Sequence, residues 1–97
     1  MEFLRQRLEE SQVEIRRVAA QGLADLAGPG DLPLFSALAE DPDWAIRNEA
    51  ARALGRLRVP ERRSLLLALA RDLEPVVART ALAALSGEPE VTASAPA

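Results

Sequence analysis

Apolar residues recur every three to four positions along most of the chain, which is the period of an amphipathic α-helix. The pattern is clearest in VEIRRVAAQGLADL, WAIRNEAARALGRL and PVVARTALAALSGE, which begin at Val13, Trp44 and Pro75. These three segments follow one another at a spacing of 31 residues. In the first of them Ile15, Ala19 and Leu23 are four residues apart and form one apolar stripe, which the other two segments repeat. An internal repeat of this length indicates a stack of similar units.

Each of these segments is preceded by a second repeated segment in the same register. FLRQRLEES, LFSALAEDP and LLLALARDL begin at Phe3, Leu34 and Leu65. They end near an acidic residue, so that Glu10, Asp41 and Asp72 superpose. Each unit therefore reads as a first helix, a tight turn that carries an acid, and a second helix.

Helix-breaking residues lie where this interpretation needs them. Gly28-Pro29-Gly30 separates the first two units, Pro60 opens the third unit near its first helical turn, and Asp43 is placed to cap the helix that follows it. We predict helices near residues 2–10, 12–27, 31–40, 43–57, 60–72 and 75–86. The predicted fold is all-α, a right-handed solenoid of three helical hairpins. Its single domain spans residues 2–86, with repeats at about 2–27, 31–57 and 60–86, and residues 87–97 form a flexible tail because they are small, polar and proline-containing.

The composition limits the kinds of core, catalytic site and metal site that the chain can form. Aromatic residues are 3% of the chain and hydrophobic residues 48%, so the core must be built from small aliphatic side chains. The absence of Cys and His removes thiolate sites, the commonest metal ligand and the usual general base at neutral pH. We predict no catalytic residues, no metal and no cofactor. The charged N-terminus argues against a signal peptide, and the lack of a long apolar run argues against a membrane span. We therefore predict a cytoplasmic location.

Unit two, DPDWAIRNEAARALGRL, resembles the consensus D-x-D-x-x-[VI]-R-x-x-A-A-x-A-L-G-x-L of short HEAT repeats, the kind named after phycobilisome lyases. The resemblance covers residues 2–86. Unit three departs from the consensus, because Ala78 replaces the motif arginine and Ser86 replaces the glycine. The resemblance implies a non-catalytic scaffold or adaptor that binds a protein partner. It leaves open an accessory, substrate-binding subunit of a lyase-like enzyme and, with less support, a nucleic-acid-binding module.

In such proteins the turn acid and the arginine about six residues later tie neighbouring units together. On this basis we expect pairs between Asp41 and Arg47 and between Glu10 and Arg16, with Trp44 packed between units. The second helices would line the inner face of the solenoid. The residues expected to contact a partner there are Arg17, Asn48, Arg52 and Arg79.

The densest basic cluster surrounds the end of unit two. It continues from Arg52 through Arg56, Arg58, Arg62 and Arg63. Guanidinium groups could bind phosphates or a carboxylate-rich partner there, or the cluster could be a solvated face with local ion pairs such as Glu49 with Arg52. A pI near 4.9 and the few aromatic residues disfavour nucleic acid as the partner.

The two ends of the stack are expected to differ. Unit one is expected to be polar on its outer side, as a terminal unit requires, whereas unit three carries Leu67, Ala78 and Ala83 at positions that are polar in the other units. We expect this apolar surface to bind a partner or to form a homodimer, unless the tail caps it. Residues 1–45 carry a net charge of −5 and residues 46–79 a net charge of +4, which also favours head-to-tail attraction.

Overall fold

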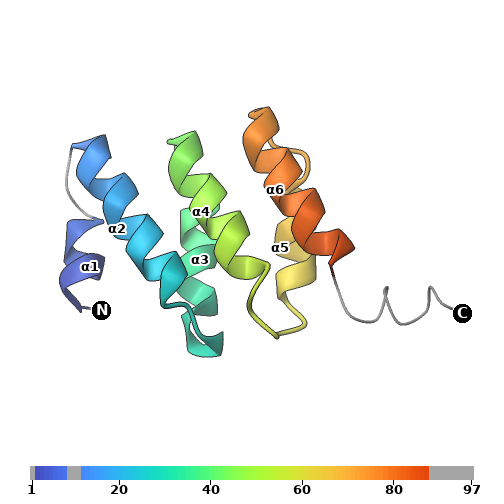
Figure 1. The fold of residues 1–97 in the computed structure, drawn as a ribbon, viewed down its shortest axis with the longest axis horizontal. Coiled ribbons are helices and arrows are strands. Elements are labelled where there is room, and N and C mark those ends of the chain that lie inside the picture. Colours follow the sequence, from blue (N-terminus) through green and yellow to red (C-terminus); the bar gives the residue numbers. More distant parts are fainter. Residues whose placement is uncertain (1, 9–11, 88–97) are drawn as a thin grey trace, which may run out of the picture.

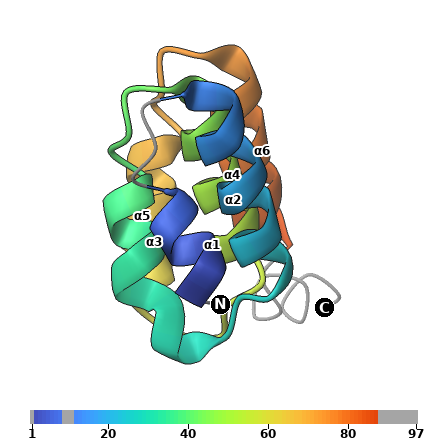
Figure 2. The ribbon, with the colours of Figure 1, turned by 90° about the vertical axis from the view of Figure 1, so that its left-hand side faces the viewer.

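The fold is given by a computed structural model that describes residues 2–8 and 12–87. The helices in this part of the chain are α1 (Glu2–Arg7), α2 (Val13–Asp25), the short 3₁₀ helix η1 (Pro29–Asp31), α3 (Leu32–Leu38), α4 (Trp44–Leu54), α5 (Arg62–Leu69) and α6 (Pro75–Ser86). They form two layers, in which α2, α4 and α6 lie side by side and α1, α3 and α5 lie behind them (Figures 1 and 2). The described residues contain no strand, so the all-α expectation is confirmed.

The core follows the apolar stripe of the repeat. Phe35, Ile46, Leu54, Leu66 and Val77 are completely buried between the two layers. Within the α2–α4–α6 layer the contacting residues are small. Fully buried alanines on α2, α4 and α6 let the helices approach closely: Ala20, Ala24, Ala51, Ala53 and Ala81. Helix α4 packs against α2, α3, α5 and α6 and is therefore the centre of the molecule.

The turn before α4 is held by two aspartates. The Asp41 carboxylate accepts a hydrogen bond from the backbone N–H of Asp43 at 2.8 Å, and the Asp43 carboxylate accepts one from the backbone N–H of Ile46 at 3.2 Å. Asp43 is thus the N-cap of α4, as expected from its position in the sequence. The cap satisfies a backbone donor that the first helical turn leaves without a partner.

Several helices are shorter than the periodicity predicts. Helix α4 ends at Leu54 and α5 at Leu69 because the chain beyond them tightens into i→i+3 hydrogen bonds, such as Leu57 N–H to Leu54 O at 3.3 Å. Pro60 precedes α5 by two residues and so lies near the first turn of that helix, as expected, although the helix begins later than predicted. The predicted flexible tail lies outside the described residues from position 88 onward. None of the described helices is long and apolar enough to cross a membrane.

Candidate protein-binding surface

The second helices expose residues at equivalent positions of the three units. One row consists of Arg17, Asn48 and Arg79, and a second row, four residues further along each helix, consists of Gln21, Arg52 and Ala83. All six are half-buried or exposed, and they alternate with the buried stripe that faces the other layer. We call these six residues the second-helix face. The two rows run across α2, α4 and α6, which lie together in one layer (Figure 2).

Arg17 joins the first two units. Its Nε and Nη2 atoms donate hydrogen bonds to the two carboxylate oxygens of Asp43 at 2.9 and 2.7 Å. The same guanidinium lies 6.0 Å from the ring centre of Trp44, which is 40% exposed. Arg17 holds the pKa of the Asp43 carboxyl below its ordinary value, mainly through these hydrogen bonds. Trp44 thus meets the preceding unit through Arg17, but its ring is exposed and is not packed between units as expected.

Arg52 is also occupied by contacts within the chain. It donates to Glu49 at 2.8 Å on its own helix and to Asp25 at 2.9 Å on α2. These two carboxylates raise the pKa of Arg52. The expected pair of Glu49 with Arg52 is confirmed, whereas the link to Asp25 depends on the packing of α4 against α2.

The other two residues that we expected to contact a partner, Asn48 and Arg79, differ in their exposure. Asn48 is half-buried, and its Oδ1 atom is shielded from solvent and accepts no hydrogen bond from the described residues. Arg79 is exposed, and within residues 2–8 and 12–87 it has no ion pair and no side-chain hydrogen bond. Of the four predicted contact residues, Arg79 has the guanidinium that the described fold leaves available.

A ladder of arginine–aspartate pairs connects the units, but not in the predicted register. Arg16 donates to Asp41 at 2.8 Å, and Arg47 donates to Asp72 through Nε at 2.7 Å and Nη2 at 2.9 Å. Each arginine reaches the turn of the following unit. The expected pair of Asp41 with Arg47 was therefore wrong, because Arg47 contacts only the backbone carbonyl oxygen of Asp41, at 2.9 Å. Glu10, the other expected partner of Arg16, lies outside the described residues.

The family model for HEAT repeats matches residues 1–86 of the chain, which is nearly the whole of the described stack. The chain belongs to the HEAT-repeat family. None of the curated proteins matches it. HEAT repeats are helical hairpins that generally mediate protein–protein interactions, and the arrangement of three hairpins in two layers agrees with this assignment.

The basic cluster of this HEAT-repeat protein is not a single exposed patch. Arg62 is only 6% exposed and donates to the backbone carbonyl oxygens of Leu57 at 2.7 Å and Gly55 at 2.9 Å, so its expected place on the surface was wrong. It is buried because the loop after α4 folds over it and needs a donor for its carbonyl groups. Arg56 similarly donates to the carbonyl oxygen of Ala24 at the end of α2, at 3.1 Å. Arg58 and Arg63 are exposed, as predicted.

Both ends of the HEAT stack are apolar. At the first unit Phe3 and Val18 are each 66% exposed, so the expectation of a polar outer side was wrong. At the third unit Leu67 is 48% exposed and Ala83 is exposed, whereas Ala78 is half-buried. Leu82, which the sequence pattern did not single out, is 54% exposed. The repeat could have indicated this position, because the residue 31 positions earlier is Ala51, which is buried at the interface with the next unit.

The described residues offer little for metal chemistry. They contain no group of three or more His, Cys, Asp or Glu side chains that could hold a metal ion. The carboxylates of the turns pair instead with arginines of the HEAT ladder, as Asp41 and Asp72 do. Their arrangement binds units to one another.

Proposed function

We propose that this HEAT-repeat protein is a small interaction scaffold that binds a protein partner along its second-helix face. The observation that supports the proposal most directly is that equivalent positions of three neighbouring helices carry half-buried or exposed side chains, most of them polar. The face includes the available guanidinium of Arg79 and lies beside the half-exposed ring of Trp44. Aromatic and arginine side chains are the residues most enriched in protein interfaces.

The chemistry of the face favours a partner segment that carries carboxylates. Arg17, Arg52 and Arg79 are the cations of the face, and its other three members are uncharged. The first two already pair with acids of this chain, so a partner carboxylate would be held mainly by Arg79. A guanidinium can bind a carboxylate through two parallel hydrogen bonds, which gives both affinity and orientation.

The experiment must avoid the arginines that hold the units together. Truncating Arg17 or Arg52 would break inter-unit ion pairs and confuse loss of binding with loss of fold. We therefore choose Gln21→Glu with Ala83→Glu, which adds two negative charges to exposed positions of the face. The matched control, Gln6→Glu with Ala37→Glu, adds the same charge to exposed positions of the other layer.

Partners would be captured on the wild-type chain and on both variants and compared by quantitative mass spectrometry, after circular dichroism shows equal folding. We expect the face variant to lose a partner that the control variant keeps. A partner retained by both variants, or lost by both, would contradict binding through the second-helix face.

We also propose that unit three takes part in self-association. The proposal is supported by the exposed leucines Leu67 and Leu82, which lie on the two helices of the last unit. Removing one such side chain from water contributes roughly 1.5–3 kcal/mol, so a few of them can support association. Light scattering across protein concentration should show a mass above that of the monomer for the wild-type chain, and a smaller excess for Leu67→Glu. A wild-type chain that stays monomeric throughout would contradict it.

A further inference from the structure

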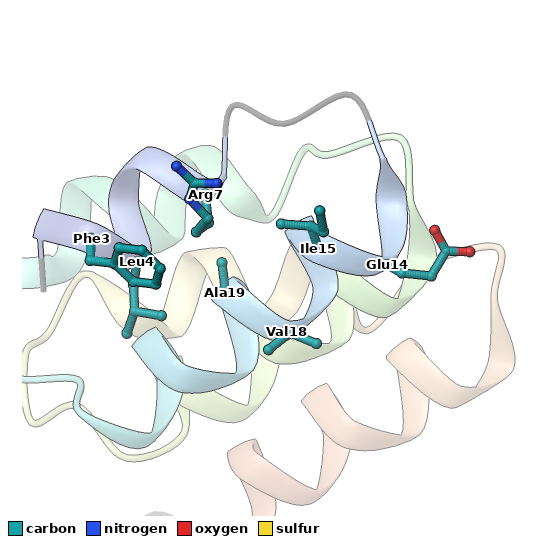
Figure 3. A pocket seen from close by; sticks show the side chains of 7 residues that line it. All are labelled: Phe3, Leu4, Arg7, Glu14, Ile15, Val18 and Ala19. Carbon is teal, nitrogen blue, oxygen red and sulfur yellow. The ribbon is translucent and has the colours of Figure 1, made fainter.

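An open apolar pocket lies at the N-terminal end of the stack. It has a volume of about 340 Å³ and is formed by α1 and α2. The lining residues are Phe3, Leu4, Arg7, Glu14, Ile15, Val18 and Ala19. Figure 3 shows the apolar side chains gathered between the two helices, with Glu14 at the end of the pocket that is farther from Phe3.

Inside the stack the positions equivalent to this pocket are covered by the preceding unit. Adding 31 to each pocket residue gives Leu34, Phe35, Leu38, Ala45, Ile46, Glu49 and Ala50 of unit two. Phe35, Ile46 and Ala50 are completely buried there, and α2 of the preceding unit packs against α4. Adding 31 once more reaches Leu66, Val77 and Ala81, which are again completely buried where α4 packs against α6. The N-terminal pocket therefore lies at the position where, inside the stack, the second helix of a preceding unit packs.

The opposite end of the molecule carries the matching helix face. In α2 and α4 the side that enters the next unit's groove includes Ala20 and Ala51, both 0% exposed. The equivalent residue of α6 is Leu82, which is 54% exposed. Helix α6 thus presents the face that fills the groove elsewhere, and no described segment covers it.

The two ends also complement each other in size. Where α4 meets α6, a Cβ atom on Gly55 would lie only 2.8 Å from the Cβ of Ala84, so this joint requires a glycine on one side. The register counterparts at the ends are Ser86 and Gly22, which are both small residues. Leu82 is larger than its counterparts, and the open pocket has room for it.

The charges at the two ends also favour contact between them. Arg17 bonds to Asp43 at the start of the next second helix, and its counterpart on the last unit is Arg79, which has no partner among the described residues. In the first unit the counterpart of Asp43 is the uncharged Gln12, and the exposed Glu14 lies two residues further along, at the rim of the pocket. Residues 1–45 are net negative by 5 and residues 46–79 net positive by 4. Head-to-tail contact would bring opposite charges together.

We propose that the N-terminal pocket binds α6 of a second copy of this chain, so that copies continue the stack head to tail. The inference rests on the proposed self-association of unit three, and it identifies the N-terminal pocket as the surface that unit three contacts. The contact is heterologous, so it adds copies in a row instead of closing into a dimer. Ala78 replaces the ladder arginine, so the joint between copies lacks the Arg–Asp pair of the joints within a chain and is weaker than they are.

The test uses two variants that each block one end. Val18→Asp places a short carboxylate in the pocket, and Leu82→Asp places one on the face of α6; both positions are exposed, so the fold is retained. Sedimentation and light scattering would be measured from roughly 10 μM to 1 mM, the range expected for a small interface. The control is Ala37→Asp, an exposed position away from both ends.

We expect the wild-type chain and the control to gain mass with concentration without levelling off at a dimer. Each blocked variant alone should stay at the monomer mass of 10.5 kDa. An equimolar mixture of the two should form a one-to-one complex and grow no further, because only one pair of intact ends is present.

The outcomes that overturn the inference are distinct. Self-association that Leu82→Asp abolishes and Val18→Asp leaves intact would show symmetric pairing of unit three, which keeps the proposed self-association and removes the head-to-tail contact. A mixture that stays monomeric would also remove it. A wild-type chain that is monomeric throughout, including one whose pocket takes up a small apolar molecule, would remove both proposals.

Discussion

Arg47 and Asp72 form the most complete tie between neighbouring units. Two hydrogen bonds of 2.7 and 2.9 Å join the guanidinium of α4 to the carboxylate in the turn before α6. The third nitrogen of the same guanidinium donates to the carbonyl oxygens of Asp41 and Pro42 at 2.9 and 3.0 Å. One side chain therefore holds its own turn and the turn of the next unit in a common geometry.

Replacing Arg47 with alanine should lower the free energy of unfolding by about 2–4 kcal/mol, because it leaves Asp72 and two carbonyl oxygens without their donor. Arg5→Ala is the control, since Arg5 makes a similar bridge to Asp31 with a side chain that is 41% exposed. Its cost should stay below about 1 kcal/mol. Urea unfolding followed by circular dichroism measures both. Equal costs would contradict the importance of the partly buried pair.

The same pair makes stability depend on pH. Arg47 holds the pKa of Asp72 below its ordinary value, mainly through its hydrogen bonds to that carboxylate. A folded pKa below the unfolded one contributes stability that is complete above about pH 4 and is lost as the pH falls through the folded pKa. Wild type should therefore exceed Asp72→Asn in stability at pH 7, and the difference should shrink below about pH 4. A difference that stays constant down to pH 2 would contradict this linkage.

Arg62 should matter for stability more than any exposed arginine of the same cluster. It is 6% exposed and donates to carbonyl oxygens in the loop after α4. Arg62→Ala should cost about 2–4 kcal/mol, because buried acceptors lose their donor and a cavity opens. Arg58→Ala, at an exposed position, should change stability by less than about 0.5 kcal/mol. Thermal unfolding of the two variants compares them, and similar losses would show that Arg62 has no special structural role.

The close approach of α4 and α6 depends on Gly55. A Cβ atom there would lie 2.8 Å from the Cβ of Ala84, so Gly55→Ala should destabilise the protein by about 1–3 kcal/mol despite the better helix propensity of alanine. The double variant Gly55→Ala with Ala84→Gly should recover part of that loss, which a double-mutant cycle would measure. Gly30→Ala is the control, because a Cβ at Gly30 meets nothing within 4 Å. Additive effects of the two substitutions would contradict direct contact.

The sequence was sufficient for several features that depend on short spacing along the chain. The 31-residue period, the apolar stripe of Ile15, Ala19 and Leu23, the cap at Asp43 and the pair of Glu49 with Arg52 could all be read from it. Helical turns and caps involve residues three or four positions apart, so their geometry follows from residue type and spacing alone. Both ends of α6 (Pro75–Ser86) were predicted without error.

The contacts between hairpins could not be read in the same way, because they depend on how far one unit is shifted against the next. That shift brings Arg16 to Asp41, and it brings Arg47 to the carboxylate of Asp72 instead of to that of Asp41. It buries Arg62 under a loop, and it leaves the groove of the first unit and Leu82 of the last without a neighbour in the described chain. A residue's helix face follows from its spacing, but whether that face is covered follows from packing in three dimensions.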